Sequence, residues 1–137
     1  MGRILLLVGG LVNAFIFVMH ISFIFGIQSS DMPPHVKQVA HLYNGCVMTT
    51  VLFFAYVSLF KWRDLLNTSL GRWTCALISV FYLQRGVVEV IVRSFEPGYF
   101  ALFMGLTILY AVAPLAAGRA KGHAVSQTAV DSPAGIR

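Results

Sequence analysis

An arginine and a glutamate lie inside an otherwise apolar stretch, WTCALISVFYLQRGVVEVIVR, which runs from Trp73 to Arg93. The stretch is long enough to cross a bilayer, and an ionised side chain at the centre of a transmembrane helix costs about 2.5–3.5 kcal/mol on insertion scales. Arg85 and Glu89 are four residues apart, so on a helix they are neighbours and we expect a buried ion pair. A guanidinium suits a ligand oxygen that carries negative charge, and a carboxylate suits proton transfer.

Two histidines and an asparagine occupy the first two apolar stretches. His41 and Asn44 are three residues apart near the start of the second stretch, and Asn13 precedes His20 by seven residues in the first, so each pair shares a helical face. Histidine exchanges protons near neutral pH, which makes His20 and His41, together with Glu89, the candidate catalytic residues. The simpler interpretation is that His20 and Asn44 only form hydrogen bonds between helices.

Motifs of the common enzyme classes are absent from the sequence. It contains no nucleotide-binding glycine motif, no zinc-protease motif and no nucleophile elbow, and we predict no metal site. The basic residues lie at the ends of apolar runs and form no basic patch, so we expect no nucleic-acid partner. Among cofactors, haem b is the one alternative, with His20 and His41 as axial ligands from two helices and Arg85 near a propionate.

The composition indicates an integral membrane protein. Hydrophobic residues make up 58% of the 137 residues. Charged residues make up 11%, and this charged fraction is less than half the value of about 25% in soluble domains. We therefore expect the lipid bilayer to be the principal surroundings of this chain, as a multi-pass protein of a cell membrane, most simply a bacterial inner membrane.

The apolar runs predict four transmembrane helices at about residues 4–27, 38–60, 73–93 and 97–117. The loop before the second helix contains Pro33 and Pro34, and proline disfavours helix at the residue before it. Short polar connections predict an all-α, up-down four-helix bundle as a single domain, residues 1–117. Ala101 and Gly105 have the small-xxx-small spacing that allows close helix approach in lipid. Residues 118–137 are small and polar, and we expect a disordered tail.

The distribution of lysine and arginine predicts the orientation. With both termini inside, the inner side holds seven basic residues and the outer loops hold two, Lys37 and Arg93. The inner seven are Arg3, Lys61, Arg63, Arg72, Arg119, Lys121 and Arg137. Because basic residues concentrate on the cytoplasmic side, we expect the N-inside, C-inside arrangement.

With this orientation, five polar side chains share the outer half of the bundle. At the helical rise, His20 and Arg85 lie about 10 Å from the outer helix ends, Asn44 about 9 Å, and His41 and Glu89 about 5 Å. Tyr82 and Tyr99 border this layer and, with Arg85 and Asn44, complete the candidate ligand-binding set. Each buried polar group carries a burial cost, so their shared depth favours a functional pocket over separate structural contacts.

The pocket suggests a protein that binds a lipophilic molecule carrying oxygen, such as a quinone or a sterol-like compound. The same side chains are compatible with binding alone and with acid–base transformation, so the pattern does not decide whether the protein is an enzyme. Two other classes stay open. One is a b-type haem electron-transfer protein that uses His20 and His41. The other is a non-catalytic subunit that docks on a membrane-protein partner or on a second copy of itself.

The predicted orientation is tested by reporter fusions. A compartment-sensitive reporter fused after Arg137 should report the cytoplasm, whereas one inserted near Pro33 should report the opposite side, because the basic residues favour that arrangement. Reporter activity in intact cells measures both. An external signal from the fusion after Arg137 would contradict the arrangement of four spans.

Overall fold

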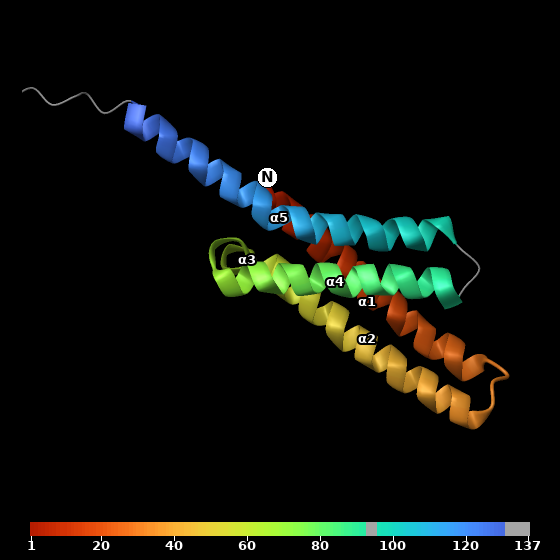
Figure 1. The fold of residues 1–137 in the computed structure, drawn as a ribbon. Coiled ribbons are helices and arrows are strands. Elements are labelled where there is room, and N and C mark those ends of the chain that lie inside the picture. The colour runs from red at the N-terminus through yellow and green to blue at the C-terminus, as the bar shows by residue number, and fades with distance from the viewer. Residues whose placement is uncertain (93–95, 131–137) are drawn as a thin grey trace, which may run out of the picture. The chain divides into compact units, whose positions relative to one another are not determined.

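The computed structural model describes the backbone of residues 1–92 and 96–130 and the side chains of residues 1–91 and 96–117. All of its regular structure is helical (Figure 1). The helices are α1 (Gly2–Ser29), α2 (Pro34–Phe60), α3 (Trp62–Asn67), α4 (Ser69–Val92) and α5 (Pro97–Val130). Four of them contain segments long and apolar enough to cross a membrane, namely Gly2–Ser29, Pro34–Phe60, Ser69–Ile91 and Pro97–Ala117. The prediction of an all-helical chain with four candidate spans is confirmed.

The chain forms two compact units, Leu6–Trp62 and Met1–Leu5 together with Arg63–Arg137. The first unit is an antiparallel hairpin of α1 and α2 (Figure 1). Near one end of the hairpin, a Cβ atom added at Gly10 would lie 2.7 Å from Leu59 Cγ, so the missing side chain is what lets the two helices approach. Near the other end, Lys37 Nζ donates a hydrogen bond to the Gln28 carbonyl oxygen at 3.0 Å.

Helix α2 begins at Pro34, earlier than the start near residue 38 that the Pro33-Pro34 pair and the polar loop predict. Pro34 occupies the first turn, where its missing N–H is no loss because that group has no partner within a helix. Pro33 precedes the helix with φ −55° and ψ 147°, which is the extended conformation that a following proline favours. The proline pair thus starts the helix, and it adds a turn that carries His35 and Lys37.

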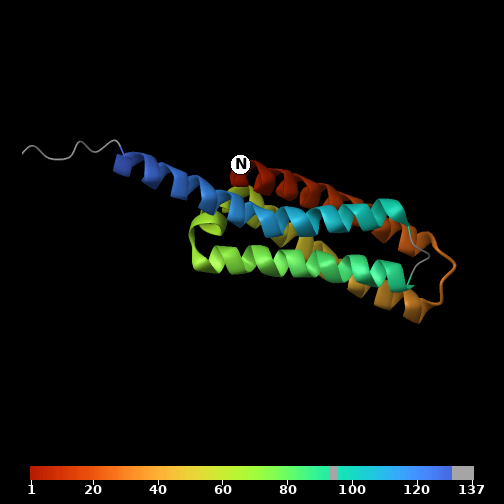
Figure 2. The same ribbon diagram turned by 45° about the horizontal axis from the view of Figure 1, so that its top comes forward.

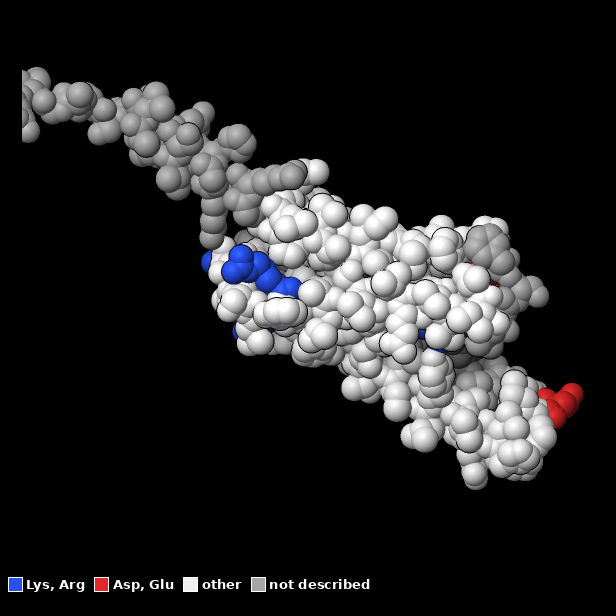
Figure 3. Space-filling model, viewed as in Figure 1, with Lys and Arg blue, Asp and Glu red and all other residues white. Residues whose placement is uncertain are grey.

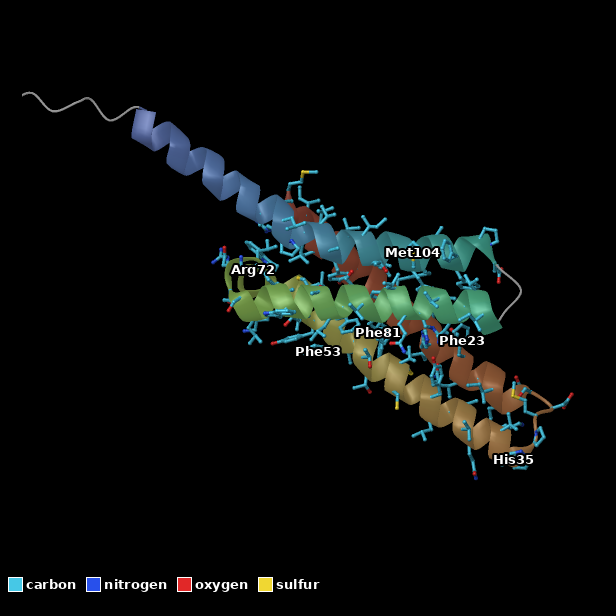
Figure 4. All side chains as sticks on the ribbon, viewed as in Figure 1. Phe23, His35, Phe53, Arg72, Phe81 and Met104 are labelled. Atoms are coloured by element: carbon cyan, nitrogen blue, oxygen red, sulfur yellow. The ribbon has the colours of Figure 1, made fainter. Side chains whose placement is uncertain are left out.

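In the second unit, α4 and α5 lie side by side and antiparallel (Figures 1 and 2). Ser79 Oγ donates to the Thr107 carbonyl oxygen at 2.9 Å and links the two helices. The buried face of α4 repeats every three or four residues, as a packed helical face does. Its members are Gly71, Cys75, Ile78, Ser79, Tyr82, Gly86 and Glu89. Met104 of α5 packs against α4 where Gly86 leaves room for it (Figure 4).

Helix α4 also starts earlier than predicted, at Ser69 rather than Trp73. Thr68 Oγ1 accepts a hydrogen bond from the Gly71 backbone N–H at 2.9 Å, so Thr68 caps the helix and satisfies one of its free N–H groups. The preceding residues form the short helix α3 instead of a loop. Gly71 faces this helix directly, because an added Cβ would lie 2.5 Å from Leu65 Cα.

Helix α5 continues to Val130, beyond residue 117 where the fourth span is predicted to end. It therefore covers part of the segment for which composition predicts disorder, and several alanines in that segment favour helix. Residues 131–137 of the expected tail lie outside the described part of the chain.

Basic side chains gather at one end of the second unit. Figure 3 shows lysine and arginine side chains around α3 and the start of α4, where Arg63 and Arg72 are exposed, beside largely uncharged helix surfaces. Gly2 lies at this same end, because a Cβ there would be 3.4 Å from atoms of both Leu66 and Ala117.

Substitution of Gly71 by alanine should destabilise the protein by about 1–3 kcal/mol, because the new methyl group would overlap the backbone of α3, which cannot move aside as a side chain can. Thermal unfolding of the detergent-solubilised protein measures the effect. Gly45→Ala is the matched control, since nothing lies within 4 Å of its added Cβ and alanine favours helix. Equal melting temperatures of the two variants would contradict the close contact between α3 and α4.

Candidate functional site

The imidazole of His20 is held in one tautomer by its own helix. His20 Nδ1 lies 2.8 Å from the Ile16 carbonyl oxygen, and a carbonyl oxygen only accepts, so Nδ1 carries the hydrogen. In a neutral ring Nε2 is then an acceptor with a free lone pair. The ring packs edge-on against Phe23 at a centroid distance of 5.2 Å and an angle of 67°. Within the described residues, His20 Nε2 has no hydrogen-bond partner.

Asn44 connects α2 to α1 beside this histidine. Its side chain is 6% exposed, and Nδ2 donates to the His20 carbonyl oxygen at 3.0 Å and to Met48 Sδ at 3.6 Å. His20 and Asn44, both predicted site residues, are thus brought together in the first unit. For Asn44, this contact is the hydrogen bond between helices that the simpler interpretation expects. Asn44 bonds the backbone of His20 and not its imidazole.

His41 lies nearer the loop between α1 and α2. Its Nε2 is 3.4 Å from Gln28 Oε1, in an exposed contact, and the Gln28 carbonyl oxygen accepts from Lys37. His41 therefore belongs to a group of side chains at the end of the hairpin, one helical turn from Asn44, and its partner in the first unit is Gln28 rather than His20.

The haem alternative, with His20 and His41 as axial ligands, stays a prediction. The two histidines lie on α1 and α2, which Asn44 links through its 3.0 Å hydrogen bond to the His20 carbonyl oxygen. Among the described residues, no three His, Cys, Asp or Glu side chains form a group that could hold a metal ion.

Asn13 extends the polar face of α1 as its spacing from His20 predicts. Its side chain is buried, and Nδ2 donates to the Gly9 carbonyl oxygen at 2.7 Å. The donors of Asn13, His20 and Asn44 all reach backbone carbonyl oxygens. No buried side-chain nitrogen or oxygen within the described residues lacks a hydrogen-bond partner, so the groups left for a ligand are partly accessible ones such as His20 Nε2.

In the second unit, Glu89 is the more buried of the two charged candidates. It is 8% exposed and lies on the packed face of α4, whereas Arg85 is half-buried. Both side chains take part in polar or electrostatic interactions. The ion pair that their spacing of four residues predicts stays a prediction.

The two tyrosines of the predicted site have different surroundings. Tyr82 is 1% exposed and stacks on Phe103 at 6.3 Å and on Tyr110 at 6.4 Å, with interplanar angles of 19° and 16°. These contacts make Tyr82 part of the packing between α4 and α5. Tyr99 is 40% exposed in the first turn of α5, and its role as a ligand contact stays a prediction.

Three residues outside the predicted site contact a member of it: Gln28, Phe23 and Met48. Gln28 ends an apolar run and looks like a loop residue, and Phe23 and Met48 look like ordinary lipid-facing side chains. Their spacing was the available signal, because Phe23 is three residues from His20 and Met48 is four from Asn44, so each pair shares a helical face.

No protein-family model, curated protein or solved structure is significantly similar to this chain. Function must therefore be argued from the geometry of the side chains.

Replacement of Asn44 by leucine should destabilise the protein by about 0.6 kcal/mol and at most about 1.7 kcal/mol, the range measured for hydrogen bonds between helices in lipid. Unfolding of the protein reconstituted in bicelles measures the change. Thr49→Val is the control, because the Thr49 hydroxyl bonds only the Gly45 carbonyl oxygen of its own helix. A smaller loss for Asn44→Leu than for the control would contradict the contact with α1.

Proposed function

We propose that this protein is a four-span membrane protein with a polar pocket in the outer half of an up-down bundle, and that the pocket binds a lipophilic molecule carrying oxygen. The observation that carries the proposal is the accessible Nε2 of His20 inside a candidate membrane span, beside the buried Asn44. A lone pair at that depth has little water to bond, so a partner is favoured.

The proposed orientation has both termini in the cytoplasm. It is supported by the short distances from Gly2 to Leu66 and Ala117, which bring the beginning of α1, α3 and the end of the fourth span to the same end of the second unit. Arg63 and Arg72 are exposed at this end, as expected for a cytoplasmic side.

In the proposed pocket, Arg85 orients the ligand oxygen, and Asn44, Tyr82 and Tyr99 contact the ligand. Glu89, His20 and His41 are the groups able to give or take a proton. The burial of Glu89, four residues after Arg85, supports a role for both charges in the pocket. An unpaired carboxylate in such surroundings is costly. Binding alone needs the same geometry as acid–base chemistry.

A role as a non-catalytic subunit is the second candidate, supported by the outer face of α5. Ala101 and Gly105 are exposed, and no atom lies within 4 Å of a Cβ added at Gly105. The small-xxx-small pair thus leaves its face open to a partner helix, which is how such pairs associate in lipid.

The proposed ion pair is tested by a double-mutant cycle. Glu89→Gln should destabilise the protein by about 3–5 kcal/mol if the pair is fully buried, because it leaves the Arg85 charge uncompensated. The combination with Arg85→Met should recover much of the loss. Unfolding in detergent measures all four proteins, and strictly additive losses would show that the two side chains do not interact.

The proposed binding is tested with a naphthoquinone and a naphthol as lipophilic probes. Protein in nanodiscs should bind at least one of them saturably, above the level of empty nanodiscs. Arg85→Lys should weaken that binding while the melting temperature stays near that of the wild type, since lysine keeps the charge but lacks the planar guanidinium. Absence of saturable binding by both probes would leave the subunit role as the better account.

A further inference from the structure

We propose that the ligand enters the α1–α2 site through a hydroxyl group that donates a hydrogen bond, as in a phenol or hydroquinone, and not through a carbonyl. This inference rests on the proposed function and specifies the ligand class of the same pocket. It follows from the hydrogen-bond donors of His20 and Asn44, which have partners in the protein, and from their acceptors, which have none in the described part of the chain.

His20 leaves an acceptor open. The Ile16 carbonyl oxygen takes the hydrogen of Nδ1 at 2.8 Å, and a neutral imidazole has one N–H only. Nε2 is consequently a lone pair without a partner in the described part of the chain.

Asn44 leaves an acceptor open as well. Its amide has two N–H groups, which face the His20 carbonyl oxygen and Met48 Sδ. The remaining capacity is that of Oδ1, which has no partner among the described residues. The amide of Asn44 must place Nδ2 toward α1, because the opposite orientation would set Asn44 Oδ1 against the His20 carbonyl oxygen.

Two side chains near the loop end of the hairpin contact Gln28: Lys37 Nζ is bonded to the Gln28 carbonyl oxygen, and His41 lies against the Gln28 side chain. At His20 Nε2, a ligand carbonyl would set one acceptor against another and leave both lone pairs without a hydrogen, whereas a hydroxyl supplies that hydrogen. The oxygen of a hydroxyl can still accept a hydrogen bond, as the role proposed for Arg85 requires. The open acceptor of His20 therefore favours a hydroxyl.

An exposed aromatic side chain also stands beside the His20 imidazole. Phe23 stands edge-on to the imidazole at 5.2 Å and is 44% exposed (Figure 4). A ring that packs against this exposed face makes favourable aromatic contacts. The combination of an apolar ring surface and an adjacent lone pair matches a phenolic compound.

The test compares three ligands that share one ring system: a naphthol, its methyl ether and the corresponding naphthoquinone. Binding to the full-length protein in nanodiscs is measured by equilibrium dialysis against empty nanodiscs. The naphthol should bind about five- to tenfold more tightly than the ether, which is the value of one hydrogen bond. His20→Phe should remove this preference while keeping the ring bulk, and His35→Phe, an exposed residue at the loop end of α2 (Figure 4), should leave it unchanged.

The outcomes separate the two proposals. Naphthoquinone binding that equals or exceeds naphthol binding in the wild-type protein would overturn the hydroxyl inference and leave the lipophilic pocket standing. Equal affinity for naphthol and its ether would overturn the inference in the same way. Failure of all three compounds to bind saturably would overturn both. Because the ranking is measured on the wild type, it does not depend on the folding of any variant.

Discussion

A polar side chain inside a bilayer has no water to bond, so it must find its hydrogen-bond partner within the protein or in a ligand. This constraint organises both units of the chain. In the α1–α2 hairpin Asn44 reaches the His20 carbonyl oxygen, and in the α4–α5 hairpin Ser79 reaches that of Thr107. Each hairpin is thus linked near the middle of its helices by one side chain bonded to a backbone group that already belongs to a helix.

His20 meets this constraint only in part, since its donor has a partner and its acceptor has none in the described part of the chain. Several polar groups in the candidate spans are satisfied by backbone carbonyls of the preceding turn, as in Asn13 and Thr107. His20 satisfies its donor in this way and retains an acceptor. A bond that only stabilised α1 would be equally well made by serine or threonine, which would leave no basic nitrogen without a partner in the described part of the chain. The imidazole therefore offers a lone pair that the fold itself does not use.

Hydropathy and charge predicted the existence of the four candidate spans, because length and apolarity alone decide whether a segment can cross a bilayer. Helix starts were less predictable, since Pro34 and Thr68 act through local cap geometry that extends α2 and α4 by a turn. For the site, spacing predicted that His20 and Asn13 share a face. It did not predict that Asn44 bonds the His20 backbone or that Tyr82 stacks between two rings, because helix rotation and register depend on packing.

The central claim is that His20 presents an unprotonated Nε2 to a hydroxyl-bearing ligand, and nitrogen NMR of histidine-labelled protein in lipid measures this directly. We expect the His20 signals to show the tautomer protonated at Nδ1. Added naphthol should shift the Nε2 resonance, and its methyl ether should not. A His20 ring protonated at Nε2 in the ligand-free protein would contradict the account, because that nitrogen would then be a donor.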